Sequence, residues 1–329
     1  MSIADTLGIL RSLADGRWYS GQVLAEAEGI SRAGVWQRIQ RLESLGLRVF
    51  AVRGKGYRLS EPLDLLDVHD IRQAAGLSSD EIDIECVPVT GSTNAEVMGA
   101  ADLMRPRALL AEFQTEGRGR RGNTWQQPFA AGLCLSLGIE ADSGANDGSA
   151  QLAMLPLAVG VALQEQLQQL GFDGLGLKWP NDLYLGDCKL GGILIEHRGE
   201  VAGRSRIVMG LGLNIRVAPT PEQSPQIDTA RLLDAWQGTH TPPSRSAIAG
   251  AAIRALLQAV TMLGQQSRES IVERWVRHDM LCGRQIQVRD GEQVIAGRYA
   301  GLNADGALLM STEQGQRRFL AGDVSLRPL

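Results

Sequence analysis

The sequence predicts an α+β fold in three parts: a small helical module, a central mixed β-sheet with helices, and a small C-terminal β-barrel. The first observation is charge, because residues 1–60 carry nine Arg and Lys against five Asp and Glu although the whole chain has a net charge of −4. The second is the alternation of strand-like and helix-like segments through the middle of the chain. The third is a run of short strands with Asp-Gly turns near the end. We place the domains at 1–62, 63–272 and 273–329.

The composition is that of an ordinary globular protein. Of the 329 residues, 44% are hydrophobic and 21% are charged, so the chain can bury a sizeable core. The first residues lack the pattern of a signal peptide, and we find no apolar run of about 18 residues, so we expect a cytoplasmic protein without a membrane span. The cysteines are far apart and the histidines do not cluster, which argues against disulfides and a structural metal. We expect the cysteines to be small core residues: Cys86, Cys134, Cys188 and Cys282.

The N-terminal module has the pattern of a winged helix-turn-helix. An apolar stripe predicts a helix over 3–13, a second helix begins after Ser20 and ends at Gly29, and Ser31 is the expected N-cap of a third. Two strand-like segments then flank a glycine-rich tip at 53–56 that carries two positive charges. Helix, turn, helix and a basic hairpin in this order indicate DNA binding.

In this fold the third helix enters the major groove and the wing contacts adjacent phosphates. A single copy makes few phosphate contacts, so we expect a dimer on two half-sites. The alternative is a small helical domain with a solvated basic face, or one that binds protein. Trp36 is bulky for a helix face that contacts bases, so a vestigial module that no longer binds DNA is a further alternative. The predicted DNA contacts are Ser31, Arg32, Trp36, Gln37, Arg38, Arg41, Arg53 and Lys55.

The central part begins after a linker at 61–67. The patterns predict a strand over 82–89, a helix over 95–104 and a second strand over 108–114. A Ser-Thr-Asn turn stands between the first strand and the helix, and either hydroxyl could simply be the helix N-cap.

The second strand runs into the loop TEGRGRRGNTW at 115–125, which contains a literal G-x-G-x-x-G. A dinucleotide-binding turn would open a helix, but Pro128 and a strand-like segment follow, and the Gly-Lys-Ser/Thr end of a P-loop is absent. Arg118, Arg120 and Arg121 repel one another in a glycine-rich loop, so we expect the loop to be mobile when empty and to close on an anionic ligand. The alternative is an exposed loop of solvated arginines.

Four strand-like segments follow a predicted helix over 151–170. LGLKWPNDLYL predicts a strand on each side of KWPND, CKLGGILIEHR predicts the strand that returns after a hairpin turn at 186–187, and IVMGLGLNI predicts a further strand. Glycine within a strand often marks a place where backbone or ligand comes close. Glycine pairs in neighbouring strands, near Lys189 and Asn214, therefore indicate a ligand lying across a sheet.

The last part of the chain changes character from about residue 271. A helix over 271–280 is followed by short strands with Asp-Gly turns at 290–291 and 305–306. This is the pattern of a small SH3-like barrel. Such a barrel could merely cap the central body.

With these segments in order, the sequence closely resembles the bifunctional biotin–protein ligases that also repress the biotin operon, over essentially the whole chain. The resemblance implies that biotin and Mg-ATP give biotinyl-5′-AMP and pyrophosphate, and that the biotinyl group passes to a lysine of a biotin carboxyl carrier protein. It also implies that the adenylate-bound enzyme forms a homodimer on a DNA operator of biotin-synthesis genes, and that the C-terminal barrel helps to bind ATP and the acceptor. The segments that carry it are SRAGVWQRIQRLESLG, GKGYRL, STN, GRGRRG, KWPNDLYL, KLGGILIE, GLGLN and FLAGDVSLR.

The resemblance further implies roles for single residues. Arg118, Arg120 and Lys189 would be catalytic, and Asp182 would help to hold Mg²⁺. At 123–124 this chain has Asn-Thr where close relatives carry a basic pair, which makes its loop less cationic. Biotin would be bound by Ser92, Thr93, Asn94, Gln114, Gly117, Arg118, Gly119, Arg120 and Lys189, and ATP by Arg121, Trp125, Asn181, Asp182 and Asn214.

Joining a carboxylate to the α-phosphate of ATP needs no general base, because a carboxylic acid with a pKa of about 4–5 is ionised near pH 7. The obstacle is the repulsion between two anions, so fixed cations and positioning supply the catalysis. Three rival interpretations remain open. They are a lipoate–protein ligase with the same chemistry, a ligand-responsive repressor that turns over no ATP, and a ligase whose DNA module is vestigial.

Overall fold

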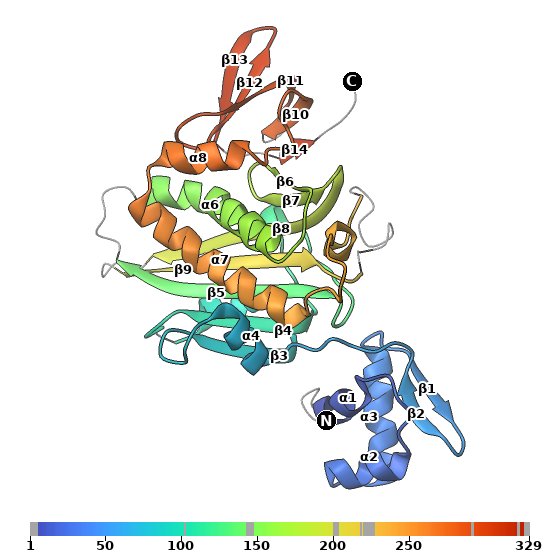
Figure 1. The fold of residues 1–329 in the computed structure, drawn as a ribbon. Coiled ribbons are helices and arrows are strands. Elements are labelled where there is room, and N and C mark those ends of the chain that lie inside the picture. Colours follow the sequence, from blue (N-terminus) through green and yellow to red (C-terminus); the bar gives the residue numbers. More distant parts are fainter. Residues whose placement is uncertain are drawn as a thin grey trace.

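The computed structural model of the protein describes residues 6–101, 103–142, 148–199, 204–217, 219, 228–290, 293–320 and 323–325. Figure 1 shows three parts in a row, with the N-terminal module and the C-terminal sheet at opposite ends of a central body. Helices and strands are both abundant and the central sheet is mixed, so the predicted α+β class is confirmed.

The N-terminal module is a helix-turn-helix with a two-stranded wing, as predicted. The side chains of Ser20 and Ser31 accept backbone amides three residues further on, so both predicted N-caps are confirmed. Gly29, between the second and third helices, has a φ of 63°, which glycine adopts far more easily than other residues. The start of the helix predicted over 3–13 lies outside the described residues. The elements are α1 (Leu7–Leu13), α2 (Gly21–Glu28), α3 (Arg32–Ser44), β1 (Val49–Val52) and β2 (Gly56–Leu59).

This module is packed against the central body. Its apolar core includes Phe129 and Ala130 of the body, and Leu63 and Leu65 of the linker pack on the same cluster. The amide of Leu63 also donates to the carbonyl of Ala14 at 2.8 Å. The linker is therefore packed against the N-terminal module. The sequence patterns did not predict this contact.

Seven strands form the central sheet, in the order β3-β4-β5-β9-β8-β7-β6. The pair β3 and β4 is parallel and the other neighbouring pairs are antiparallel. Each strand predicted in this region is present. The strands are β3 (Asp83–Thr90), β4 (Arg107–Gln114), β5 (Gly132–Asp142), β6 (Leu175–Lys178), β7 (Asp182–Leu185), β8 (Cys188–Gly199) and β9 (Arg204–Asn214).

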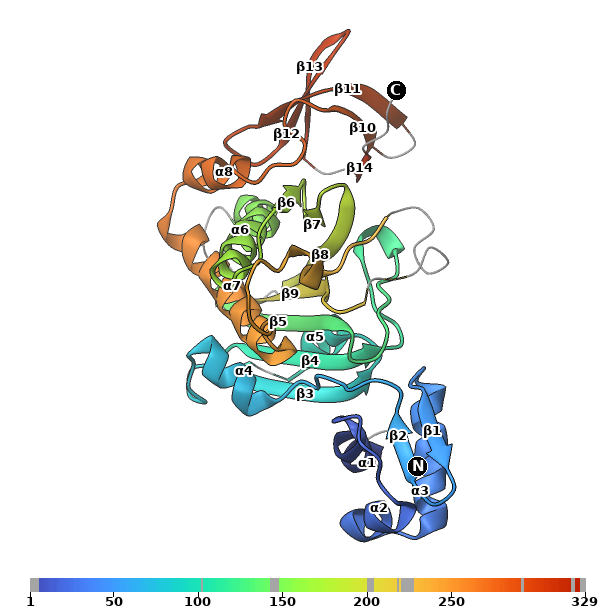
Figure 2. The same cartoon turned by 45° about the vertical axis from the view of Figure 1, so that its right-hand side comes forward.

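Helices cover both faces of this sheet. Figure 2 shows α4 (Val68–Ala75), α6 (Gly148–Gln169) and α7 (Arg245–Gln265) on one face and the short α5 (Thr93–Gly99) on the other. The sequence patterns did not predict α4 or α7. By length and composition α7 could cross a membrane, but 56% of its most apolar stretch is buried inside the protein, where it packs on α4 and α6 as a core helix. Arg254 lies in the middle of its apolar run.

The helix predicted over 95–104 is shorter than expected, since α5 ends at Gly99. The guanidinium of Arg206 on β9 donates to the carbonyl oxygens of Met98, Ala100 and Ala101. These bonds occupy carbonyl groups that a longer helix would use for its own backbone. Arg206 lies 106 residues from Ala100, so no local pattern indicates this stop.

The C-terminal part is an antiparallel sheet in the order β13-β12-β11-β10-β14, preceded by α8 (Arg268–Val276), which ends before the predicted 280. Gly306 has a φ of 74° in the predicted turn at 305–306, whereas the turn at 290–291 lies partly outside the described residues. Trp179 Nε1 donates to the carbonyl of Gly306 at 2.9 Å, so this sheet rests on the KWPND segment. The strands are β10 (Gln285–Asp290), β11 (Gln293–Leu302), β12 (Leu308–Thr312), β13 (Gly315–Phe319) and β14 (Asp323–Ser325).

A fully buried arginine ties the linker to the sheet. Arg245, the first residue of α7, donates to Glu112 at 2.7 Å, to the carbonyl of Asp64 at 2.6 Å and to the carbonyl of Gly132 at 2.7 Å. The second carboxylate oxygen of Glu112 accepts the amide of Leu66 at 2.6 Å. Both charges are thus paired and hydrogen-bonded, as burial of an ion pair requires.

The four cysteines are free thiols in different settings. Cys134 is buried and Cys86 and Cys188 are half-buried, but Cys282 is exposed, so the expectation of a core position is wrong for Cys282. Burial raises the pKa of Cys86 and of Cys134 to about 12, which keeps both thiols protonated at neutral pH.

Candidate functional site

The predicted site residues of the central body gather at one end of the sheet. Gln114 ends β4, and Gly132 begins the antiparallel strand β5 beside it. Asn214 ends β9 opposite Gly132, and Asp182 begins β7 opposite Gly192. Antiparallel pairing therefore brings together strand ends that lie far apart in the sequence.

Glycines form the floor of this site. Gly210 and Gly212 point toward one face of β9, where a side chain at the first would collide with the carboxamide of Asn94 and a side chain at the second with the ring of Trp125. Gly192 is paired with Gly212, so its side-chain position faces the same way. The groups that come close to these strands are the side chains of Asn94 and Trp125, whereas a ligand lying across the sheet stays a prediction.

A buried set of polar side chains stands above the floor. Gln114 Oε1 accepts from the amide of Thr93 at 2.8 Å and from its hydroxyl at 3.0 Å. The hydroxyl of Ser136 lies 2.7 Å from that of Thr93 and also contacts Asn94 Oδ1. Ser92 caps α5, which is the structural role that its position on the chain favoured. These groups offer a fixed pattern of donors and acceptors to a small polar ligand.

The arginine loop folds into a hairpin of its own, joining two strands of the sheet. The amide of Trp125 donates to the carbonyl of Gly117 at 2.8 Å, and the amide of Gly119 donates to the carbonyl of Asn123 at 2.7 Å. Apart from one 3₁₀ turn at Arg120–Gly122, no helix follows the glycines, as we predicted in rejecting a dinucleotide-binding turn. The mobility of the empty loop stays a prediction.

Each predicted catalytic cation contacts an acidic or amide group. Arg120 Nη1 donates to Asn181 Oδ1 at 2.8 Å. Lys189 Nζ lies 2.8 Å from Asp182 Oδ2. Arg118 Nη1 lies 3.5 Å from Glu196 Oε1. Arg121 is exposed in the same loop, with a φ of 53°. The loop and β8 thus bring positive groups toward one place, and the partners given above for Arg118, Arg120 and Lys189 are groups that an anionic ligand could replace.

Two buried donors near the floor have no hydrogen-bond partner among the residues that the structure describes. They are Trp125 Nε1, above Gly212, and Nδ2 of Asn214. Asn214 is held through its Oδ1, which accepts from Gln127 Nε2 at 3.2 Å. Because buried donors are nearly always hydrogen-bonded, both mark a place where a ligand could supply acceptors.

Three residues that the sequence analysis missed complete the arrangement: Ser136, Gln127 and Glu196. Gln127 also donates to the carbonyl of Leu213 at 2.7 Å and so fixes the end of the arginine loop. Glu196 is the last letter of KLGGILIE, and that position was the only signal available in the sequence.

The predicted Mg²⁺ ligand Asp182 is a single carboxylate. Among the residues that the structure describes, no three His, Cys, Asp or Glu side chains lie close enough together to hold a metal ion. Mg²⁺ is commonly held by one or two carboxylates together with substrate phosphates. The donor set at Asp182 fits that mode of binding.

The predicted DNA contacts differ in their surroundings. Arg38 is engaged by Glu28 at 3.0 Å and is only 15% exposed, a setting that favours a structural role between α2 and α3. Trp36 is 55% exposed. Lys55 at the wing tip lies 5.9 Å from the centre of the Trp18 ring. The remaining predicted contacts are exposed: Ser31, Arg32, Gln37, Arg41 and Arg53.

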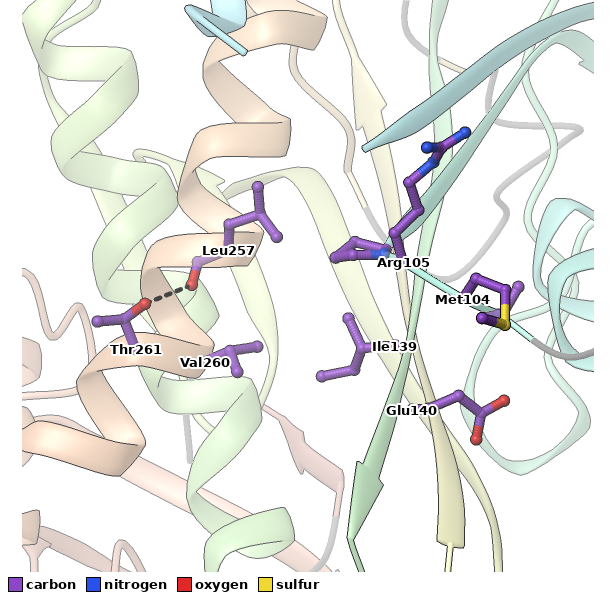
Figure 3. Close-up of a pocket in the computed structure, with 9 residues that line it drawn as sticks. Met104, Arg105, Ile139, Glu140, Leu257, Val260 and Thr261 are labelled. Carbon is purple, nitrogen blue, oxygen red and sulfur yellow. Dashed lines mark hydrogen bonds between the residues drawn. The ribbon is translucent and has the colours of Figure 1, made fainter. Parts of the chain in front are cut away.

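A separate pocket of about 490 Å³ lies at the other end of the sheet (Figure 3). Ile139, Leu257 and Val260 give it an apolar lining, and Arg105 and Glu140 stand beside them. Both charged groups already have partners, since Arg105 pairs with Asp83 at 2.7 Å and Glu140 with Arg206 at 2.5 Å. This pocket shares no residue with the site at the arginine loop.

Fold and site together define the class: a DNA-binding module joined to an enzyme body that brings cations to an anionic ligand. The chain matches the Biotin/lipoate A/B protein ligase family over 84–214, an HTH domain over 7–58 and the Biotin protein ligase C terminal domain over 281–327. It belongs to the biotin protein ligase family, within the bifunctional ligase/repressors.

Individual relatives show the extent of the match. Bifunctional ligase/repressor BirA of Escherichia coli (strain K12) is 35% identical over 322 residues, which are 98% of this chain and 97% of that protein. The protein of the same name from Salmonella typhimurium is 34% identical over the same shares. Biotin protein ligase from Aquifex aeolicus, solved in complex with biotin and ATP, is 25% identical with a TM-score of 0.60 and covers 74% of this chain and 98% of its own.

Proposed function

We propose that this protein joins biotin to ATP, transfers the biotinyl group to a lysine of a biotin carboxyl carrier protein, and represses biotin-synthesis genes as an adenylate-bound homodimer. The observation that carries the proposal is that Arg118, Arg120 and Lys189 stand at the same end of the sheet as the polar side chains of Thr93, Asn94 and Gln114. The relatives named above combine ligase and repressor in one chain, which supports both halves.

In the first step, a carboxylate oxygen of biotin attacks the α-phosphorus of ATP. A P–O bond forms, pyrophosphate leaves with the electron pair of the broken bond, and biotinyl-5′-AMP results. Arg120 and Lys189 stabilise the charge that develops at phosphorus, and Arg118 holds the phosphoryl group. Thr93, Asn94 and Gln114 bind the biotin head group with the other residues inferred for that site. The nucleotide lies near Trp125, Asn181 and Asn214, with Arg121 at the loop.

Mg²⁺ would be bound together with the phosphates of ATP. Asp182 would hold it, and the ion would neutralise charge on the departing pyrophosphate. In the structure Asp182 is paired with Lys189 at 2.8 Å, so the carboxylate that would hold the ion also positions this lysine beside the substrate.

In the second step, the acceptor lysine must be a free amine, although its usual pKa is about 10.4. Its nitrogen attacks the acyl carbon of the mixed anhydride, AMP leaves, and the new amide nitrogen loses a proton. The C-terminal sheet contacts the segment that carries Asn181 and Asp182, and this contact supports a role for the sheet in binding ATP and the acceptor.

Biotin-dependent exchange of pyrophosphate into ATP tests the ligase half. We expect exchange with biotin and not with lipoate. Exchange with lipoate alone would make the protein a lipoate–protein ligase, and no exchange with either would leave a ligand-responsive repressor.

A mobility-shift assay with the promoter of the organism's own biotin-synthesis genes tests the repressor half. We expect a shift that requires biotinyl-5′-AMP, together with a dimer in sedimentation when the adenylate is present. Normal ligase activity without any shift would indicate a vestigial DNA module.

A further inference from the structure

Glu196, which has no role in the mechanism above, connects two parts of the proposed biotin site. Its Oε2 accepts from Asn94 Nδ2 at 2.8 Å, and its Oε1 lies 3.5 Å from Arg118 Nη1. The Glu196 side chain is 30% exposed, so the carboxylate stands at the rim of the site. One side chain thus contacts both the polar pocket and the arginine loop.

The contact with Asn94 fixes the orientation of a buried amide. Asn94 is 4% exposed, and its Oδ1 accepts from the hydroxyl of Ser136. Its Nδ2 also lies 3.4 Å from the carbonyl of Leu194, but Glu196 is closer and carries a charge. A charged acceptor makes the stronger hydrogen bond. Without Glu196 the amide would retain one long bond at Nδ2, and a poorly satisfied buried donor is costly.

The contact with Arg118 is weaker. The Arg118 side chain is 46% exposed and 3.5 Å from its partner, the geometry of an ion pair that contributes little stability. A phosphoryl group offers several oxygens and more charge, so it can replace the carboxylate. Until then the carboxylate offsets the repulsion among the arginines of the loop.

We propose that Glu196 is a positioning residue with two tasks. It orients Asn94 for the biotin head group, and it pairs with Arg118 until the phosphoryl group of the adenylate replaces its carboxylate. This inference rests on the proposed ligase function, which supplies both ligands.

Two substitutions separate the tasks. Glu196→Gln keeps an oxygen that can accept from Asn94 but removes the charge that competes for Arg118. We expect its KM for biotin to stay within about 2-fold of wild type and its adenylate to dissociate ~3-fold more slowly, the scale of a half-exposed ion pair. Glu196→Ala also removes the acceptor. We expect its KM for biotin to rise ~10-fold or more, with a smaller change in kcat, because a buried donor loses its main partner.

A double-variant cycle identifies the partner. Combined with Arg118→Gly, the Glu196→Gln change should no longer affect adenylate dissociation, because the group through which it acts is gone. Glu85→Gln is the matched control. It removes a partly exposed carboxylate paired with Arg107 on the same sheet, and it should leave both KM and adenylate dissociation unchanged.

Three results would overturn the inference: equal increases of KM in the Gln and Ala variants, no slowing of dissociation in Glu196→Gln, or slowing that persists without Arg118. Calorimetric titration of the full-length variants with biotin and with biotinyl-5′-AMP gives the same comparison without turnover. Failure of the proposed function is a different result. It would appear as absence of pyrophosphate exchange in the wild-type protein.

Discussion

Arg245 and the arginines of the 115–125 loop place the same guanidinium group in opposite settings. Arg245 is fully buried, and its hydrogen bonds go to Glu112 and to the carbonyls of Asp64 and Gly132. Arg118 is half-exposed and meets its carboxylate at 3.5 Å. The guanidinium of Arg245 stabilises the fold, whereas that of Arg118 can exchange its protein partner for a ligand. Burial and the number of protein partners therefore separate structural from functional arginines where the sequence shows only arginine.

Replacing the buried arginine should have the largest effect. Arg245→Met leaves Glu112 buried without its cation, and we expect the free energy of unfolding in urea to fall by ~3–5 kcal/mol. Arg231→Met is the control, since its pair with Asp234 is 51% and 41% exposed, and it should cost less than about 1 kcal/mol. Equal losses of unfolding free energy in the two variants would show that the buried and the exposed arginine do not differ in their contribution to stability.

Arg120→Ala should leave folding intact and slow the chemistry. We expect pyrophosphate release with biotin and ATP to fall by ~10²-fold or more, the scale for losing one preorganised donor to a developing oxyanion. Arg105→Ala, at the far end of the sheet, should release pyrophosphate at the wild-type rate. A near-normal rate in Arg120→Ala would exclude the proposed role.

Arg118→Gly should loosen the product of the first step. We expect biotinyl-5′-AMP to dissociate ~10-fold faster, because a charge-assisted hydrogen bond contributes about 1.5–3 kcal/mol. A chase of labelled adenylate with unlabelled adenylate measures the rate directly. A rate equal to that of wild type would contradict this role for Arg118.

The smallest change is expected at the wing. Lys55→Ala should weaken DNA binding about equally for all sequences and reduce the salt-dependence slope by about 1, as loss of one phosphate contact does. Arg38→Ala should leave that slope unchanged, because Arg38 is engaged by Glu28, and should lower the thermal stability of the module instead. Arg11→Ala is the control for charge removal elsewhere on the module. Equal slopes in Lys55→Ala and wild type would argue against a phosphate contact at Lys55.

Much of the fold could be predicted because its signals are local. Ser20, Gly29 and Ser31 mark helix ends through bonds to residues within a turn, and those caps were readable in the sequence. The end of α5 could not be predicted, because Arg206 from a distant strand donates hydrogen bonds to the carbonyl groups there. The docking of Phe129 into the N-terminal module was equally hidden, since it depends on how two separate cores meet.

The site shows the same division. Gln114 and Asn214 stand at strand ends inside recognisable motifs, so their meeting at one end of the sheet could be expected from strand order. Ser136 and Glu196 belong to the site only because β5, β9 and β8 pair in one particular register. A shift of one residue in either pairing would turn these side chains to the opposite face. Local sequence patterns do not indicate which residues of these distant strands are paired.

The glycine floor has a practical consequence for altering the substrate. Gly210 and Gly212 already carry the smallest side chain available, and Asn94 and Trp125 rest directly on them. Nothing on that side can be trimmed to admit a bulkier vitamin analogue, such as one bearing a reporter tag. A site for such a molecule must instead be enlarged by shortening the side chains that lie on these glycines, beginning with Trp125.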